Sequence, residues 1–155
     1  MCRISLRLTC EVMPNIHPFL VHFPVALLTT ALSFEVLGVL LSRGEFSKAG
    51  WWIQMAGTIG IVAAVLSGLS AKSQVFIPLP AAGTFDAHQQ LAFVTAGGFA
   101  ALLLWRLGMR AKIDPGRRFL YLTLFAASLA CLWVGAWYGG ELVYRFGVGV
   151  VSPVP

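Results

Sequence analysis

Histidine is rare in this 155-residue chain, which has three of them. His17 and His22 lie in the stretch NIHPFLVHFPVALL, where a long apolar run begins, and His88 lies at the start of a later run. Imidazole nitrogens bind iron, zinc and copper, and lone histidines also hydrogen-bond at helix ends. These three side chains are therefore the first candidates for a functional site.

Long apolar segments have to position the histidines. The chain is 58% hydrophobic and only 11% charged, whereas a soluble domain has about 25% charged residues. Four runs are each long enough to cross roughly 30 Å of hydrocarbon as a helix, namely residues 17–41, 50–71, 87–105 and 119–140. Because the links between them are short, the pattern predicts an all-α, integral membrane four-helix bundle with up-down-up-down topology.

The predicted membrane domain covers residues 17–145, between an N-terminal segment, 1–16, and an apolar C-terminal tail, 146–155. The first dozen residues lack an apolar core long enough for a signal peptide, and Met13 is an alternative start of the reading frame. Cys2 and Cys10 precede Met13, so a disulfide between them requires both the longer start and an outward location.

Basic residues are distributed unevenly around the four runs. Seven lie near the first and third links: Arg43, Lys48, Arg106, Arg110, Lys112, Arg117 and Arg118. Four lie on the other side: Arg3, Arg7, Lys72 and Arg145. Cytoplasmic loops are enriched in Lys and Arg. We therefore expect both termini and the 72–86 loop on the outer side of the membrane, which is the periplasmic side of the inner membrane if the source is a Gram-negative bacterium. The net charge of +5 is thus accounted for by basic residues that flank segments in a lipid bilayer. Their distribution argues against nucleic acid as a partner.

The depths of the histidines can be compared by counting along each helix. His22 lies 20 residues before Ser42, and His88 lies 18 residues before Arg106, which correspond to about 30 and 27 Å. The two imidazoles are therefore predicted at one level. His17 lies 25 residues before Ser42, or about 38 Å, and is predicted to be interfacial.

Small side chains follow each of these two histidines down its helix. They are Ala26, Thr29, Thr30 and Ser33 below His22, and Ala92, Thr95 and Gly98 below His88. Two grooves without bulky side chains would accept a flat ligand, so the pattern predicts a b-type haem whose iron is held by His22 and His88, with His17 as an alternate ligand. Two alternatives stay open: hydrogen bonding at helix ends alone, and a three-imidazole site for zinc or copper.

Ionisable and aromatic residues near the helix ends supply further candidates. Glu35 lies deep in the first run, near the expected depth of Gln54. Either it handles protons beside a quinone, or it bonds between helices or to Arg43. Near the histidine level, Glu141, Tyr144 and Arg145 are candidates for contacts with haem propionates or with a ligand imidazole, whereas Arg145 could equally be an interfacial anchor.

Two motifs carry a resemblance to a known family. The stretches HPFLVHFPVALL near the start and GGELVYRFGVGV near the end resemble a bacterial membrane family, domain of unknown function 2231, from about Met13 onward. The resemblance implies a fold similar to four-helix b-type cytochromes, in association with c-type cytochromes and redox enzymes. A histidine is common in this family where Phe146 stands here, so the resemblance implies a different ligand set in this chain or the loss of a haem.

No nucleophile, base and orienting group occur together, so no catalytic residue is predicted. The leading hypothesis is a haem b-binding electron-transfer subunit or anchor that links quinone to an outer-face redox partner, within a larger redox membrane complex or beside a c-type cytochrome. The alternatives are a structural subunit without a cofactor and a histidine-based metal-binding or transport module.

Overall fold

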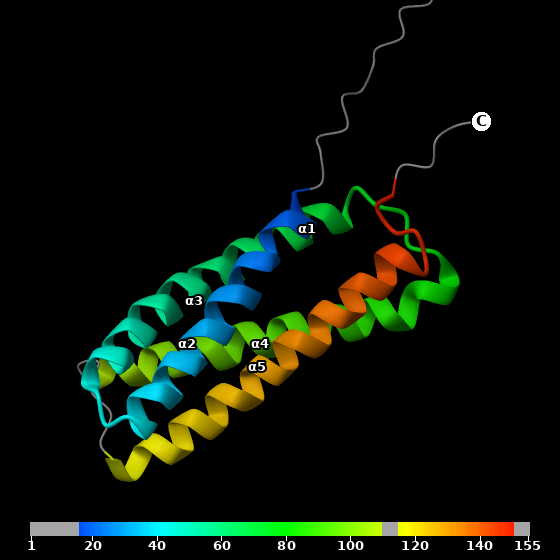
Figure 1. The fold of residues 1–155 in the computed structure, drawn as a ribbon. Helices are drawn as coiled ribbons and strands as arrows, with labels where there is room; N and C mark the ends of the chain where they lie inside the picture. The colour runs from blue at the N-terminus through cyan, green and yellow to red at the C-terminus, as the bar shows by residue number, and fades with distance from the viewer. Residues whose placement is uncertain (1–15, 110–114, 151–155) are drawn as a thin grey trace, which may run out of the picture.

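The computed structural model describes residues 16–109 and 115–150. The described chain contains helices and no strand (Figure 1): α1 (His17–Leu20), α2 (His22–Leu40), α3 (Gly44–Lys72), a 3-10 turn η1 (Leu79–Ala81), α4 (Ala82–Gly108) and α5 (Pro115–Tyr144). Four segments are long and apolar enough to cross a membrane: His17–Leu40, Gly44–Lys72, Leu79–Gly108 and Gly116–Tyr144. The all-α four-helix prediction is confirmed.

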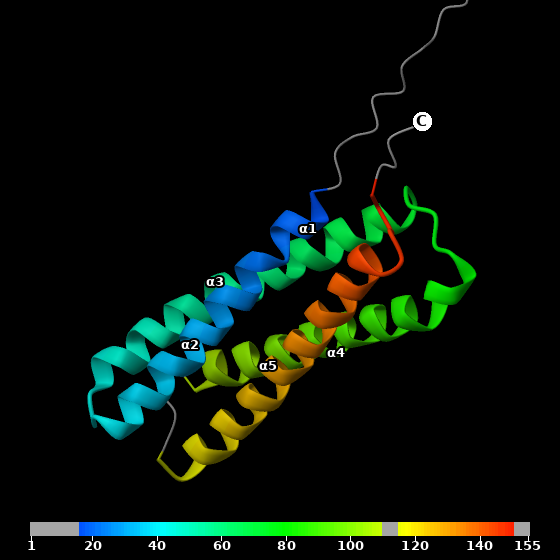
Figure 2. The same ribbon diagram turned by 45° about the vertical axis from the view of Figure 1, so that its right-hand side comes forward.

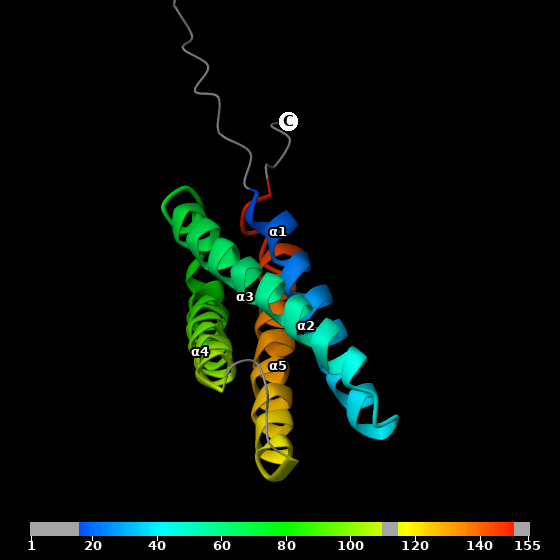
Figure 3. The same ribbon diagram turned by 90° about the vertical axis from the view of Figure 1, so that its left-hand side faces the viewer.

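Each long helix runs antiparallel to the next one in the chain (Figures 1 and 2). Helix α2 packs mainly on α3, and α4 packs mainly on α5, so the bundle consists of two helical hairpins. The two hairpins contact each other less extensively, through α3 with α4 and through α2 with α5. Figure 3 shows the α2–α3 hairpin inclined to α4 and α5. Helices α2 and α4 are therefore diagonal in the bundle.

The two ends of the bundle differ in their residues. One end carries α1, the 73–81 link and the end of α5, and we name it the histidine end because His17 and His88 lie there. The opposite end carries the 41–43 link and the start of α5, and we name it the arginine end because Arg118 lies there.

Proline interrupts the first span. Pro18 stands in the first turn of α1, where its missing N–H removes no helical bond. Pro24 cannot donate to the carbonyl of Leu20, and the helix breaks at Val21. The first span therefore begins with a separate turn, α1, in front of α2.

The helices extend beyond the apolar runs from which they were predicted. Helix α3 begins at Gly44 instead of 50, α4 at Ala82 instead of 87, and α5 at Pro115 instead of 119. Hydropathy marks the part of a helix inside hydrocarbon, whereas backbone hydrogen bonding continues into the polar interface. Asp86 and Gln89 form a capping-box pattern that predicts the start of a helix, but Asp86 lies inside α4.

Apolar side chains fill the middle of the bundle. The buried cluster comprises Leu28, Ala31, Ile61, Phe99, Leu102, Tyr121, Phe125 and Leu129. Large apolar side chains such as Ile59, Leu104 and Trp137 are more than half exposed on the outside. An outer surface of this kind is expected where lipid is the solvent. The packed middle separates a cavity at the histidine end from a polar cluster nearer the arginine end.

Candidate functional site

A cavity of about 600 Å³ opens among the helices at the histidine end. Its volume lies in the range of roughly 300–1,000 Å³ that is typical of small-molecule sites. His17, His22 and His88 all line it, and most of the remaining wall is apolar or glycine. All three candidate ligands therefore border one space.

The rings of His17 and His88 are in contact in this cavity. Their ring centroids are 6.2 Å apart and their planes are inclined by 82°. Both side chains are half-buried, and they come from α1 and α4, which belong to different hairpins. The fold therefore brings together two histidines that are 71 positions apart in the sequence.

His22 is placed differently. Its side chain is exposed, and its Nδ1 lies 2.7 Å from the carbonyl oxygen of Pro18, one turn earlier in the chain. It borders the same cavity, but the ring that meets His88 is that of His17.

A backbone carbonyl orients the ring of His88. Its Nδ1 lies 2.8 Å from the carbonyl oxygen of Gly135 on α5. Because a carbonyl oxygen only accepts hydrogen bonds, Nδ1 carries the proton, and the lone pair of the imidazole is on Nε2. A metal-binding histidine is commonly held in this way, with one nitrogen donating to a carbonyl.

A serine orients the ring of His17. Its Nδ1 lies 3.0 Å from Ser67 Oγ on α3. The Ser67 hydroxyl donates its own proton to the carbonyl of Ala64, at 2.9 Å. A serine hydroxyl that donates to Ala64 can accept from His17, and this arrangement favours the tautomer with the proton on Nδ1.

Glycines make room for both rings. A Cβ atom at Gly68 would lie 2.9 Å from Cε1 of His17, and a Cβ atom at Gly139 would lie 3.1 Å from Cε1 of His88. Both distances are shorter than ordinary carbon–carbon contacts of about 3.5–4.0 Å. The absence of a side chain at each position is thus a condition for the observed ring positions.

The two hairpins have the same pattern of buried residues, displaced by a constant number of positions in the sequence. The buried residues Pro24, Leu28, Ala31 and Glu35 of α2 correspond, at an offset of 71, to Thr95, Phe99, Leu102 and Arg106 of α4. The same offset relates His17 to His88 and Gly68 to Gly139. His17 and His88 therefore occupy equivalent places in two similar hairpins.

A buried polar cluster ties the four long helices together toward the arginine end. Arg106 on α4 forms an ion pair with Glu35 on α2, and both are at most 3% exposed. Tyr121 on α5 donates to the side-chain oxygen of Gln54 on α3. Arg106 also donates to the Tyr121 hydroxyl at 3.3 Å and to the Ser47 carbonyl at 2.9 Å.

This cluster corrects two sequence-based expectations. Glu35 bonds between helices, as one alternative predicted, but its partner is Arg106 and not Arg43 or Gln54. Arg106, which was counted as a basic residue at the third link, is a buried ion-pair partner. A signal for the pairing existed, because one acidic and one basic residue within apolar runs favour each other as partners.

The ion pair also explains why counting along the helices separated His17 from His88, whose rings are in contact. Depth was counted from Ser42 and Arg106, but Arg106 is level with Glu35, seven positions before Ser42. His17 precedes Glu35 by 18 positions, and His88 precedes Arg106 by the same 18. Counted from the ion pair, His17 and His88 lie at one level. This equal spacing was available in the sequence.

The remaining sequence candidates lie at the rim of the site. Arg145 is 70% exposed in its side chain and bonds to Glu141 at 3.3 Å. Tyr144 borders the cavity but is 92% exposed. The ring of Phe146 lies 5.3 Å from the Arg145 guanidinium. Lys72, predicted only as a basic residue of the outer side, borders the cavity, and its Nζ donates to Gln89 at 2.8 Å.

Within the described ranges, no group of three or more His, Cys, Asp or Glu side chains is placed to hold a metal ion. The three-imidazole site considered for zinc or copper is therefore not formed there. Cys2 and Cys10, with their suggested disulfide, lie outside the described residues.

The chain belongs to a family of predicted membrane proteins, DUF2231, whose model matches residues 13–152. The family resemblance of the two end motifs is thereby confirmed, and its match also begins at Met13. Comparison with curated proteins and with solved structures gave no match. The resemblance to b-type cytochromes remains an expectation.

Proposed function

We propose that this chain is a membrane electron-transfer subunit that binds one b-type haem between His17 and His88. The sequence pattern predicted His22 and His88 as the two ligands, with His17 as an alternate. We retain His88 and replace His22 by His17. A single observation carries it: two imidazoles from different hairpins meet at 6.2 Å on the wall of a large apolar cavity.

The distance between the rings suits two ligands on one metal ion. A metal–imidazole bond is about 2 Å long, and each ring centroid lies about 1 Å beyond the nitrogen, so two imidazoles on opposite sides of one ion have centroids about 6 Å apart. The hydrogen bond to the Gly135 carbonyl leaves the lone pair of His88 on Nε2, and the hydrogen bond to Ser67 orients the ring of His17.

The number of ligands indicates which kind of metal group is expected. A protein-bound zinc ion takes three or four protein ligands, and the described residues offer no such set. A haem iron already has four porphyrin nitrogens, so two imidazoles complete its coordination. The donor set therefore fits haem better than a bare metal ion.

The cavity fits the organic part of such a group as well. Its walls are mainly apolar, and its basic side chains among the described residues are Lys72 and the three histidines. Lys72 stands at the rim, where an acidic group of a mostly apolar ligand could reach it. Lys72 thus replaces Arg145 as the leading candidate for contact with a propionate.

A bound haem would supply one-electron transfer. The chain's own contribution is to hold two imidazoles, to exclude water by apolar walls and to expose an apolar surface to the bilayer, where a lipid-soluble quinone would have access. At the histidine end, the haem would exchange electrons with a redox partner. That partner is either a subunit of a larger complex or a c-type cytochrome. Glu35 has no role in it, because Arg106 already engages its carboxylate.

The visible spectrum of protein purified from haem-sufficient cells tests the proposal. We expect split α and β bands after reduction, with loss of these bands in His17→Ala and in His88→Ala. His22→Ala is the matched control, because His22 borders the same cavity, and we expect it to retain the spectrum.

Two outcomes would count against parts of this proposal. A colourless, folded wild-type protein would refute haem binding and favour a structural subunit without a cofactor. A haem spectrum that depends on His22 and His88 but survives in His17→Ala would refute the ligand assignment and restore the pair expected from sequence.

A further inference from the structure

A second cavity lies at the arginine end, away from the histidines. It is an open pocket of about 460 Å³ between the end of α2, the 41–43 link and the first turns of α5. Its lining consists of Gly38, Val39, Ser42, Gly44, Arg118, Phe119 and Leu122. The proposed haem site uses none of these residues.

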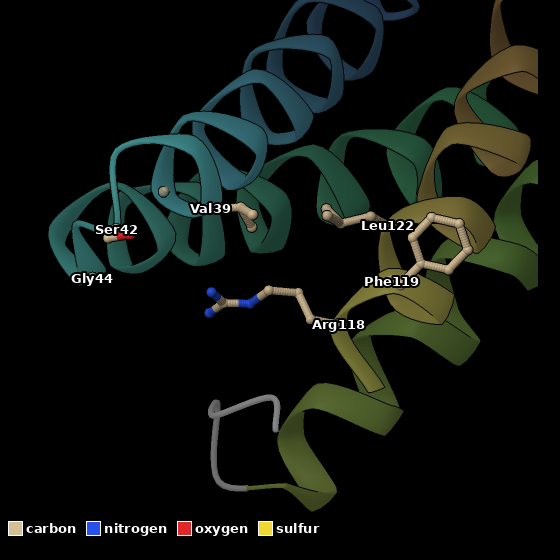
Figure 4. A pocket seen from close by; sticks show the side chains of 7 residues that line it. Val39, Ser42, Gly44, Arg118, Phe119 and Leu122 are labelled. Carbon is tan, nitrogen blue, oxygen red and sulfur yellow. The ribbon is translucent and has the colours of Figure 1, made fainter. Parts of the chain in front are cut away.

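Arg118 is the charged residue of this lining. Figure 4 shows its side chain reaching from α5 toward the turn that carries Ser42 and Gly44. Its Nε atom is buried and has no hydrogen-bond partner in the part of the chain that the structure describes. A buried guanidinium donor without an acceptor is costly, so an anionic oxygen beside it would stabilise the arrangement.

Backbone groups of the same cavity also favour an anion. Gly44 begins α3, and no side chain caps this helix end. The first N–H groups of a helix lack intrahelical acceptors and carry partial positive charge. Glu45 in the first turn of α3 is an opposing negative charge, but its side chain is exposed, whereas Arg118 lines the cavity.

The rest of the lining is apolar. Val39 and Leu122 point toward each other across the cavity in Figure 4, and Phe119 completes this wall. The cavity lies where the spans Gly44–Lys72 and Gly116–Tyr144 begin, at the expected depth of lipid headgroups. A ligand that suits it has a phosphate at one end and a hydrocarbon chain at the other.

We propose that this cavity binds an anionic phospholipid, with its phosphate on Arg118 and an acyl chain along Val39 and Leu122. Basic pockets between membrane helices recognise anionic lipid headgroups by the same combination of charge and apolar contact. The sequence beside the cavity supports the choice of an anionic lipid, because the basic residue Arg43 stands between the lining residues Ser42 and Gly44.

Native mass spectrometry of the full chain tests this site. The detergent-solubilised protein is exchanged with phosphatidylglycerol or with phosphatidylcholine, and bound lipid is counted. We expect wild type to bind more phosphatidylglycerol than phosphatidylcholine. In Arg118→Gln the ratio of the two bound lipids should fall about fivefold, the usual effect of one basic residue near anionic lipid. Arg117→Gln is the matched control, since Arg117 is exposed and does not line the cavity.

A second variant leaves the charge intact. Val39→Trp fills the apolar wall, and it should also reduce phosphatidylglycerol binding while Arg118 is present. Equal lipid preference in wild type, Arg118→Gln and Val39→Trp would overturn the proposal. Displacement of the lipid by excess inorganic phosphate, with no dependence on the acyl chain, would overturn the lipid assignment in favour of a free-phosphate site.

Discussion

The glycines beside the two histidines offer the sharpest test of the site geometry. In Gly68→Ala the new Cβ atom would lie 2.9 Å from Cε1 of His17. An ordinary carbon–carbon contact is about 3.5–4.0 Å, so the ring has to retreat by about 0.6 Å or more. Metal–ligand distances tolerate deviations of about 0.2 Å, so the displaced ring is a poorer ligand.

The expected loss follows from this displacement. Changes in the groups that support a metal ligand typically weaken binding by about 10–100-fold, and we expect Gly68→Ala to fall in this range. Gly139→Ala should have a smaller effect, because its Cβ atom would lie 3.1 Å from His88. Both substitutions replace a helical glycine, and alanine stabilises a helix interior by up to about 1 kcal/mol, so folding itself should not suffer.

Haem titration of the apoprotein, followed by difference absorbance, measures this effect, and thermal unfolding is recorded in parallel. Gly97→Ala is the control, because a Cβ atom there meets no atom within 4 Å. The reasoning fails if Gly68→Ala binds haem as tightly as wild type. It also fails if Gly97→Ala weakens binding as much, because the loss would then not come from contact with the ring.

Other predictions concern the buried ion pair, the orientation of His17 and the topology. Arg106→Met leaves Glu35 buried without its ion-pair partner and should lower the free energy of unfolding by about 3–5 kcal/mol, measured with denaturant. The double variant with Glu35→Leu should recover most of this stability. A double variant as unstable as Arg106→Met would contradict the pairing. Ser67→Ala removes the acceptor of His17 Nδ1–H and should weaken haem binding about tenfold, whereas exposed Ser70→Ala should not. In a chain otherwise free of cysteine, Gly83→Cys should react with a membrane-impermeant thiol reagent added to intact cells; labelling from the cytoplasmic side alone would reverse the predicted topology.

The offset between the hairpins shows why the contact between His17 and His88 was missed from sequence. Few residues are identical at an offset of 71, so the repeat is hidden in the sequence and emerges from the shared pattern of burial. The charged residues carried the clearer signal, since Glu35 and Arg106 each follow a histidine by 18 positions. Once these two are recognised as partners, His17 and not His22 is level with His88.

The sequence by itself determined the class of the protein. Apolar runs long enough to span hydrocarbon require helices, because only internal hydrogen bonding satisfies the backbone in lipid, and short links make neighbouring helices antiparallel. The family was also readable from the residues, and so was the position of the histidines near the start of the first and third spans. Hydropathy could not determine the helix ends, since hydrogen bonding continues past the apolar runs.

Only the tertiary structure decided which side chains meet. Rotation and inclination of the helices are set by packing across the whole bundle, for example by Gly57 accepting Leu28 and by the ion pair of Glu35 with Arg106. These contacts involve residues on different helices, and no local pattern specifies them. The break at Val21, the inclination of the hairpins and the glycines at positions 68 and 139 together bring His17 to His88.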